Sequence, residues 1–165
     1  GEPVAYQTFD GLQKMYGTKR LADATPMVAS EALGTYWAAK LLAAQGMVEA
    51  YLRRAGYATP VDTTSLSVSD AAMIDALLAD WTSVFALEMG APAIMQTPKG
   101  VESAASKART ALRDLISGRL RLPLSINRAI LGSVCTPEQR DDIYATPAPE
   151  LDDNFFARMR HGWPD

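Results

Sequence analysis

The feature that most constrains the fold is an apolar stripe at helical spacing in the first half of the chain. Its members recur at steps of four, three, four, three and four: Trp37, Leu41, Ala44, Val48, Tyr51 and Ala55. Side chains at such steps share one face of an α-helix, whereas those of a β-strand alternate between two faces. The pattern predicts a long helix from about Ser30 to Arg54, with Ser30 as its N-cap and Gly56 just beyond its end.

Two further segments have helical periodicity. The spacing predicts one helix from Ser69 or Asp70 to about Met89 and another from about Lys99 to Ser117, which Gly118 caps. The expected buried faces are Ile74, Leu77, Leu78, Trp81, Val84 and Phe85 in the first, and Val101, Ala105, Ala108, Leu112 and Leu115 in the second. The opposite, polar face of the second helix is expected to contain Glu102, Ser106, Arg109 and Arg113.

The N-terminal segment predicts shorter helices. Thr8 is placed to cap a helix from Phe9 to Tyr16, which Gly17 ends, and 18–23 adds a further turn. Pro26 then breaks the pattern, because the residue before a proline is pushed out of the helical region. The predicted fold class is therefore mainly α, a small helical bundle with one long helix.

The chain changes character after Leu124. Residues 125–165 contain four of the ten prolines and no periodic segment of the roughly 12 residues that an independent helix needs. They carry four Arg against seven Asp and Glu, whereas residues 1–124 carry twelve basic and twelve acidic residues. We expect a helical domain over 1–124 and an extended, acidic C-terminal docking tail over 125–165. Between them, 119–124 alternates and predicts a short strand or an extended arm.

Aromatic and other large apolar residues are scattered through this tail. Large apolar side chains of this kind anchor protein–protein interfaces, where the loss of one anchor typically costs about 2 kcal/mol or more. We therefore expect the tail to dock on another chain or to fold back on its own domain, and docking is the preferred interpretation. The residues predicted to dock are Tyr144, Phe155, Phe156, Met159 and Trp163.

The residues needed for catalysis are scarce. The chain has one histidine, His161 near its end, and one cysteine, Cys135, so neither a nucleophile–histidine pair nor a histidine–cysteine metal site is expected. Glycine-rich phosphate-binding motifs are missing. Glu49 and Glu88 lie in apolar helices and are expected to face solvent or an arginine, because an unpaired buried carboxylate is costly. We predict no catalytic, cofactor-binding or metal-binding residues and no enzymatic activity.

Other classes are disfavoured by composition. No apolar run approaches the roughly 18 residues of a membrane-spanning helix, and the first residues lack the basic and apolar regions of a signal peptide. The net charge of −3 is not typical of a protein that binds nucleic acid through a basic surface.

Three motifs, in this order, carry a family resemblance. The first runs from Tyr6 to Tyr16-Gly17 and continues to Leu21 and Thr25. The second is the helix end Tyr51-Leu52-Arg53-Arg54, followed by Tyr57 and Pro60. The third is Leu112 and Leu115, followed by Gly118 and Leu120. Together they make the chain resemble the Mu-like head–tail connector (head-completion) proteins of phages, over about three-quarters of its length. Gly56 and the tail depart from that pattern.

The resemblance implies a structural virion protein that is assembled in the host cytoplasm. It implies a homo-oligomeric ring, usually of twelve subunits, beneath the portal protein. Such a ring extends the channel for double-stranded DNA, which passes without specific binding, and it joins the capsid to tail or neck proteins. A body without net charge suits that passage, because each phosphate contact tightens binding to DNA.

Two alternatives remain open from the residues alone. A small helical adaptor or regulatory protein that binds a single cytoplasmic partner would be a monomer or dimer. An enzyme or an enzyme accessory subunit that uses carboxylates would need a pocket where two acids converge, with Glu49 and Glu88 as the candidates.

Overall fold

The computed structural model describes residues 4–26 and 32–126, and these residues confirm a mainly helical fold. They form five α-helices, a short 3₁₀ helix and a single isolated β-bridge. The elements are α1 Phe9–Tyr16, α2 Thr18–Ala24, α3 Leu33–Arg54, α4 Val68–Gly90, the 3₁₀ helix η1 Pro92–Met95 and α5 Ala104–Ser117. All of them belong to one unit, Gly1–Asn127, and the chain's second unit is Arg128–Asp165.

The helix ends follow from local capping. Thr8 accepts a hydrogen bond from the Gly11 N–H at 3.0 Å, as expected for the N-cap of α1. Gly17 has φ 89° and Gly118 has φ 79°, and both end helices at a conformation that favours glycine. The expected Ser30 cap lies outside the described residues.

Three predicted helix starts were wrong. α3 begins at Leu33 after the N-cap Ala32, which makes no side-chain capping bond, and not near Ser30. α4 is capped by Ser67, whose hydroxyl accepts from the Asp70 N–H, and so it begins before Ser69. α5 is capped by Ser103 and begins at Ala104 rather than near Lys99, because Gly100 makes a turn there at φ 87°. Val101, expected on the buried face of α5, precedes the helix and is exposed.

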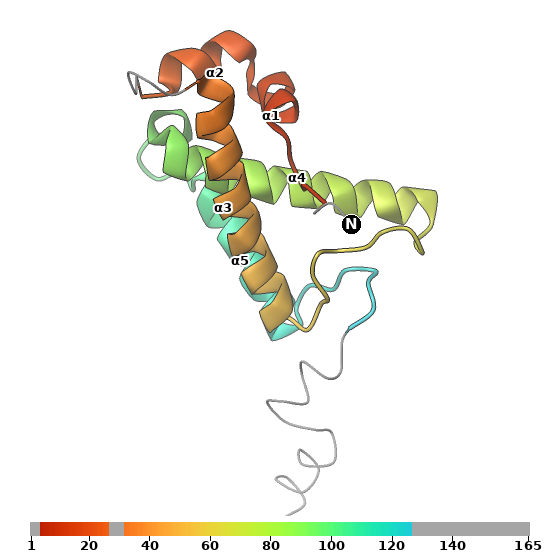
Figure 1. Cartoon of the computed structure of the whole chain (residues 1–165). Coiled ribbons are helices and arrows are strands. Elements are labelled where there is room, and N and C mark those ends of the chain that lie inside the picture. Colours follow the sequence, from red (N-terminus) through yellow and green to blue (C-terminus); the bar gives the residue numbers. More distant parts are fainter. Residues whose placement is uncertain (1–3, 27–31, 127–165) are drawn as a thin grey trace, which may run out of the picture. The chain divides into compact units, whose positions relative to one another are not determined.

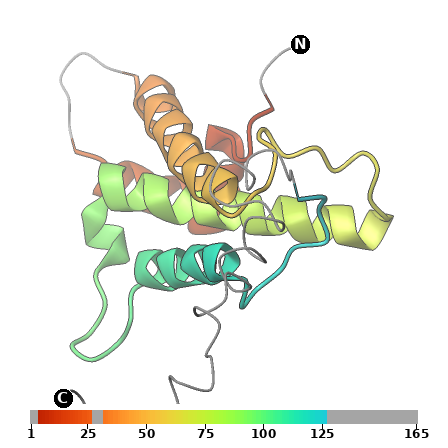
Figure 2. The same ribbon diagram turned by 90° about the horizontal axis from the view of Figure 1, so that it is seen from below.

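Helix α3 crosses α4 and α5 packs against both, as Figures 1 and 2 show. The predicted stripe of α3 is its buried face, with Trp37, Leu41, Ala44, Val48 and Ala55 buried and Tyr51 half-buried. Leu52, which the stripe missed, is fully buried beside it. The predicted face of α5 is likewise buried from Ala105 to Leu115.

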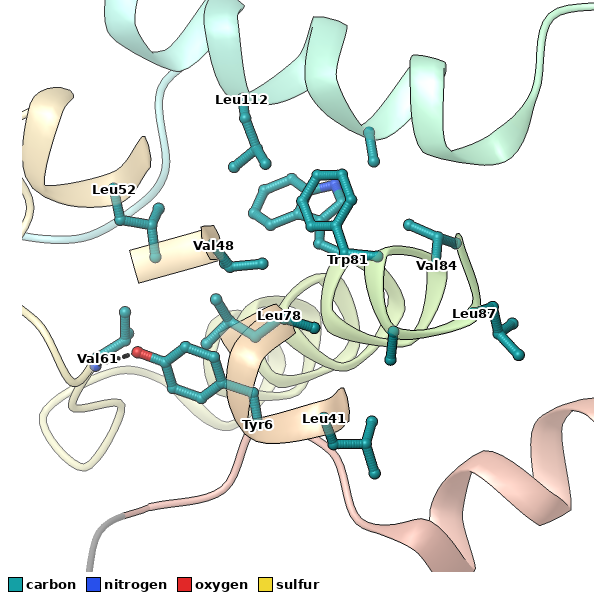
Figure 3. Packing of buried hydrophobic residues seen from close by; sticks show 14 of the residues in the cluster. Tyr6, Leu41, Val48, Leu52, Val61, Leu78, Trp81, Val84, Leu87 and Leu112 are labelled. Carbon is teal, nitrogen blue, oxygen red and sulfur yellow. Dashed lines mark hydrogen bonds between the residues drawn. The ribbon is translucent and has the colours of Figure 1, made fainter. Parts of the chain in front are cut away.

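The central helix is α4. Every side chain from Trp81 to Leu87 is buried, including the polar Thr82 and Ser83. Figure 3 shows Trp81, Val84 and Leu87 projecting from this part of α4 in different directions into the apolar cluster. A helix buried on all sides needs neighbours around it, and α3, α5 and the N-terminal segment supply them.

The N-terminal segment is fastened to α3 and to the loop that precedes α4. The side-chain amide of Gln45 accepts from the Tyr6 N–H at 3.0 Å and donates to the Val4 carbonyl at 2.8 Å. The buried Tyr6 hydroxyl accepts a hydrogen bond from the Val61 N–H at 2.9 Å, drawn as a dashed line in Figure 3. Gln7 donates to the Ser83 hydroxyl at 2.9 Å, which ties the same segment to α4.

The segment after α5 returns to the end of α3. The Leu122 N–H donates to the Tyr57 hydroxyl at 3.1 Å, and Tyr57 forms the isolated antiparallel bridge with Ile126. The expected short strand over 119–124 does not form, because only this single bridge pairs the segment in the described part of the chain. The other interpretation, an extended arm, describes it better, with Leu122 buried as its anchor.

Exchange of Gly90 for alanine should destabilise the fold. A Cβ at Gly90 would lie 2.8 and 2.9 Å from two ring carbons of the fully buried Trp37. The expected loss is about 1–3 kcal/mol of unfolding free energy, as for other overpacked sites.

Gly46→Ala is the matched control, because nothing lies within 4 Å of its Cβ position inside α3. It should gain roughly 0.5–1 kcal/mol from helix propensity. Urea unfolding measures both, and an unchanged G90A would contradict this packing.

Tyr6→Phe should destabilise the fold by about 1–3 kcal/mol at pH 7, because it leaves the buried Val61 N–H without its acceptor. Burial raises the pKa of Tyr6 from near 10 to about 12. The folded state therefore retains the phenol proton longer than the unfolded state. The contribution of the Tyr6 hydroxyl to the free energy of unfolding is complete below pH 10. It is lost as the pH rises toward 12, by at most about 1.4 kcal/mol per pH unit. Urea unfolding should show the deficit of Y6F shrinking over that range, and a constant deficit would refute the assignment.

Candidate docking surfaces

The residues predicted to dock on a partner lie outside the described residues. Tyr144, Phe155, Phe156, Met159 and Trp163 all follow residue 126, as do Cys135 and His161. The candidate sites that the structure offers are therefore surfaces of the helical unit.

The two acids considered for a catalytic pocket each pair with an arginine. Glu88 on α4 forms a two-bond ion pair with Arg109 on α5, in which Nη1 lies 2.9 Å from Oε2. Glu49 lies 3.8 Å from Arg53 one turn along α3. These pairs confirm the expectation that each acid faces solvent or an arginine. The described residues also contain no cluster of three or more His, Cys, Asp or Glu that could hold a metal ion.

Arg109 corrects the predicted polar face of α5. Its guanidinium lies 5.4 Å from the centre of the Phe85 ring, and it binds Glu88 across the seam between α4 and α5. The hydrogen bond to Glu88 raises the pKa of Arg109. Arg109 therefore joins two helices, while Arg113 one turn later is exposed as expected.

Charge is segregated within the helical unit, although residues 1–124 balance to zero. Residues 55–98 contain five Asp and Glu and no Lys or Arg. Residues 99–126 contain six Lys and Arg against two acids. The sequence-level balance therefore conceals one acidic and one basic region.

The acidic region includes an exposed helix face. In both Figure 1 and Figure 2 the N-terminal half of α4 extends past α3 and α5. We call residues 68–77 the acidic arm. Its only charges are Asp70, which is half-buried one turn before Ile74, and Asp75, which is exposed. Val68 is 89% exposed and Met73 is 45% exposed. Ile74 and Leu78 on the opposite side are buried, which fixes the face that remains outside.

Three exposed arginines of the basic region and two at the end of α3 lie where α3 and α5 end. The two ends lie together in Figure 1, and the Tyr57–Leu122 hydrogen bond joins the segments that follow them. We call the five exposed arginines there the basic end: Arg53, Arg54, Arg113, Arg119 and Arg121. Leu120 and Ile126 are 40% and 41% exposed in the same segment.

A groove of about 480 Å³ lies between the loop before α4 and the segment after α5. Its lining is mixed, polar and apolar, and comprises Tyr57, Ala58, Pro60, Val61, Asp62, Ser65, Leu66, Pro123, Leu124 and Ser125. Because it is built on both sides of the Tyr57–Leu122 junction, it places apolar surface beside the basic end.

No family model matches the chain, and neither does any curated protein or solved structure. Within the described ranges, no helix is both long and apolar enough to span a membrane.

The Glu88–Arg109 pair should couple α4 to α5 measurably. Its two side chains are only 38% and 29% exposed, whereas the Asp10–Lys14 pair on α1 is 74% and 77% exposed. A double-mutant cycle with E88A and R109A should give a coupling energy of about 0.5–1 kcal/mol. The same cycle with D10A and K14A should give a smaller coupling energy, which high salt reduces further. Equal couplings would mean that the seam does not shield its ion pair.

Proposed function

We propose that this chain is a structural subunit of a phage head-to-tail connector, which forms a ring beneath the portal protein and joins the capsid to tail or neck proteins. In this proposal the ring extends the channel for double-stranded DNA and does not bind it specifically. No catalytic step and no cofactor is part of the proposal.

The proposal is supported by the hydrogen bonds that join the three motifs of the resemblance to one another. Tyr6 of the first motif holds the Val61 N–H directly after Pro60 of the second. Tyr57 of the second holds the Leu122 N–H just after Leu120 of the third. The residues that carry the resemblance therefore connect separate segments of the fold. We expect structural proteins of one family to share residues of this kind.

Further support comes from residues of the first motif beyond Tyr6. Gly17 provides the positive-φ joint between α1 and α2. The Thr25 hydroxyl accepts from the Trp37 indole N–H at 2.9 Å and donates to the Leu21 carbonyl at 2.6 Å. The motif therefore determines how the first two helices attach to α3.

The mass of the purified full-length chain, measured by light scattering alone and with its portal protein, tests the proposal. A ring-sized particle, alone or on the portal, is the expected result. A chain ending at Asn127 should bind the portal at least about tenfold more weakly, because it lacks the tail aromatics predicted to dock. This end point keeps Ile126 and its bridge to Tyr57, which an end at Leu124 would remove.

A monomer or dimer that ignores the portal would contradict the connector proposal. It would favour the small helical adaptor that binds a single cytoplasmic partner. Full portal binding by the shortened chain would leave the connector in place and remove the docking role of residues 128–165.

A further inference from the structure

We propose that the acidic arm of one subunit docks on the basic end of the next copy of the chain, beside the groove lined by Pro60, Leu66 and Leu124. This inference rests on the proposed function for the closed ring, and it names the two surfaces that would make each contact. The occupant of the basic end is thus a second copy of this chain.

These surfaces carry more charged residues than stabilisation of the helix dipoles explains. A helix dipole favours acids in the first turn and bases in the last turn, and its influence falls off beyond them. Asp70 and Arg54 satisfy that preference. Asp75 lies farther along α4 and Arg121 lies four residues past the end of α5, so the dipoles do not account for these two. Arg119 lies closer to the end of α5, where its dipole favours a cation. Among the described residues, no ion pair involves any of these three.

Each surface also exposes apolar side chains beside its charges, which are acidic on the arm and mainly basic on the second surface, where Asp62 in the groove is the exception. Val68 and Met73 accompany the aspartates of the arm, while Leu120 and Ile126 accompany the arginines of the basic end. The groove adds Pro60, Leu66 and Leu124 to the second surface. A contact between the two would cover apolar surface at its centre and place opposite charges at its rim, which is the usual anatomy of an interface.

The two surfaces lie on different elements of the unit. The arm is the projecting half of α4, and the basic end lies where α3 and α5 finish (Figure 1). Two different patches that fit each other make a heterologous contact, and repetition of such a contact with a suitable rotation closes a ring.

Charge reversal in the full-length chain tests the contact. Variant A carries D70K and D75K in the arm. Variant B carries R113E, R119E and R121E in the basic end, which leaves two arginines against three acids there. Each variant alone should associate at least about tenfold more weakly than the wild-type chain, equivalent to about 1.4 kcal/mol. A mixture of A and B should assemble again, because the reversed arm of A meets the reversed end of B and the unchanged surfaces also match. A variant that has merely lost its fold would not be rescued by mixing.

The matched controls are K19E and D23K, which make the same kinds of charge change at exposed positions of α2. They should leave the mass unchanged. Assembly of the wild-type chain that survives in A and B would overturn the assigned contact and leave the connector proposal intact. A wild-type dimer that is lost in A and B and restored in their mixture would support the contact and contradict the ring. A wild-type chain that stays monomeric at high concentration and low salt would overturn the contact.

Discussion

The fold depends on the burial of the second half of α4. Since every side chain from Trp81 to Leu87 is buried, α4 needs cover from α3, α5 and the N-terminal segment together. Each large apolar side chain in this run contributes roughly 1.5–3 kcal/mol when fully buried. Inside this cover Ser83 bonds to Gln7, and the Trp37 ring approaches Gly90 so closely that a side chain there has no room. The first half of α4 extends beyond the cover, and this leaves the acidic arm exposed.

Most of the helices could be predicted from the sequence because most of them have one buried face. The stripe from Trp37 to Ala55 reports such a one-sided environment directly. In the centre of α4 the pattern correctly predicted the burial of Trp81, Val84 and Phe85. It could not show that the polar Thr82 and Ser83 are as buried as these neighbours. Helix starts were less predictable, because a cap depends on which hydroxyl reaches a free N–H. Ser67 and Ser103 make that bond, whereas the predicted helix starts were Ser69 or Asp70 and Lys99.

The candidate surfaces were harder to predict than the helices. Whether Arg109 faces solvent depends on Glu88, 21 residues earlier on another helix, and no local pattern encodes that pairing. The basic end forms because α3 and α5 pack on each other and the Tyr57–Leu122 hydrogen bond joins the segments that follow them. One signal was present in the sequence, the absence of any Lys or Arg from residues 55–98, and the balanced charge of 1–124 obscured it. The residues predicted to dock, from Tyr144 to Trp163, lie outside the described part of the chain.

The two proposals constrain each other through the exposed arginines. Phosphate contacts from Lys and Arg release counterions and tighten binding to DNA, so a channel lined by Arg119 and Arg121 would hold the DNA that it must let pass. A contact that places the acidic arm of a neighbour over these arginines removes them from the channel and also covers Leu120 and Ile126. In the proposed ring, the segregated charge of the helical unit would serve assembly in a way that a uniformly neutral surface could not. The proposed contact would also let a chain with basic and acidic regions present little net charge to DNA.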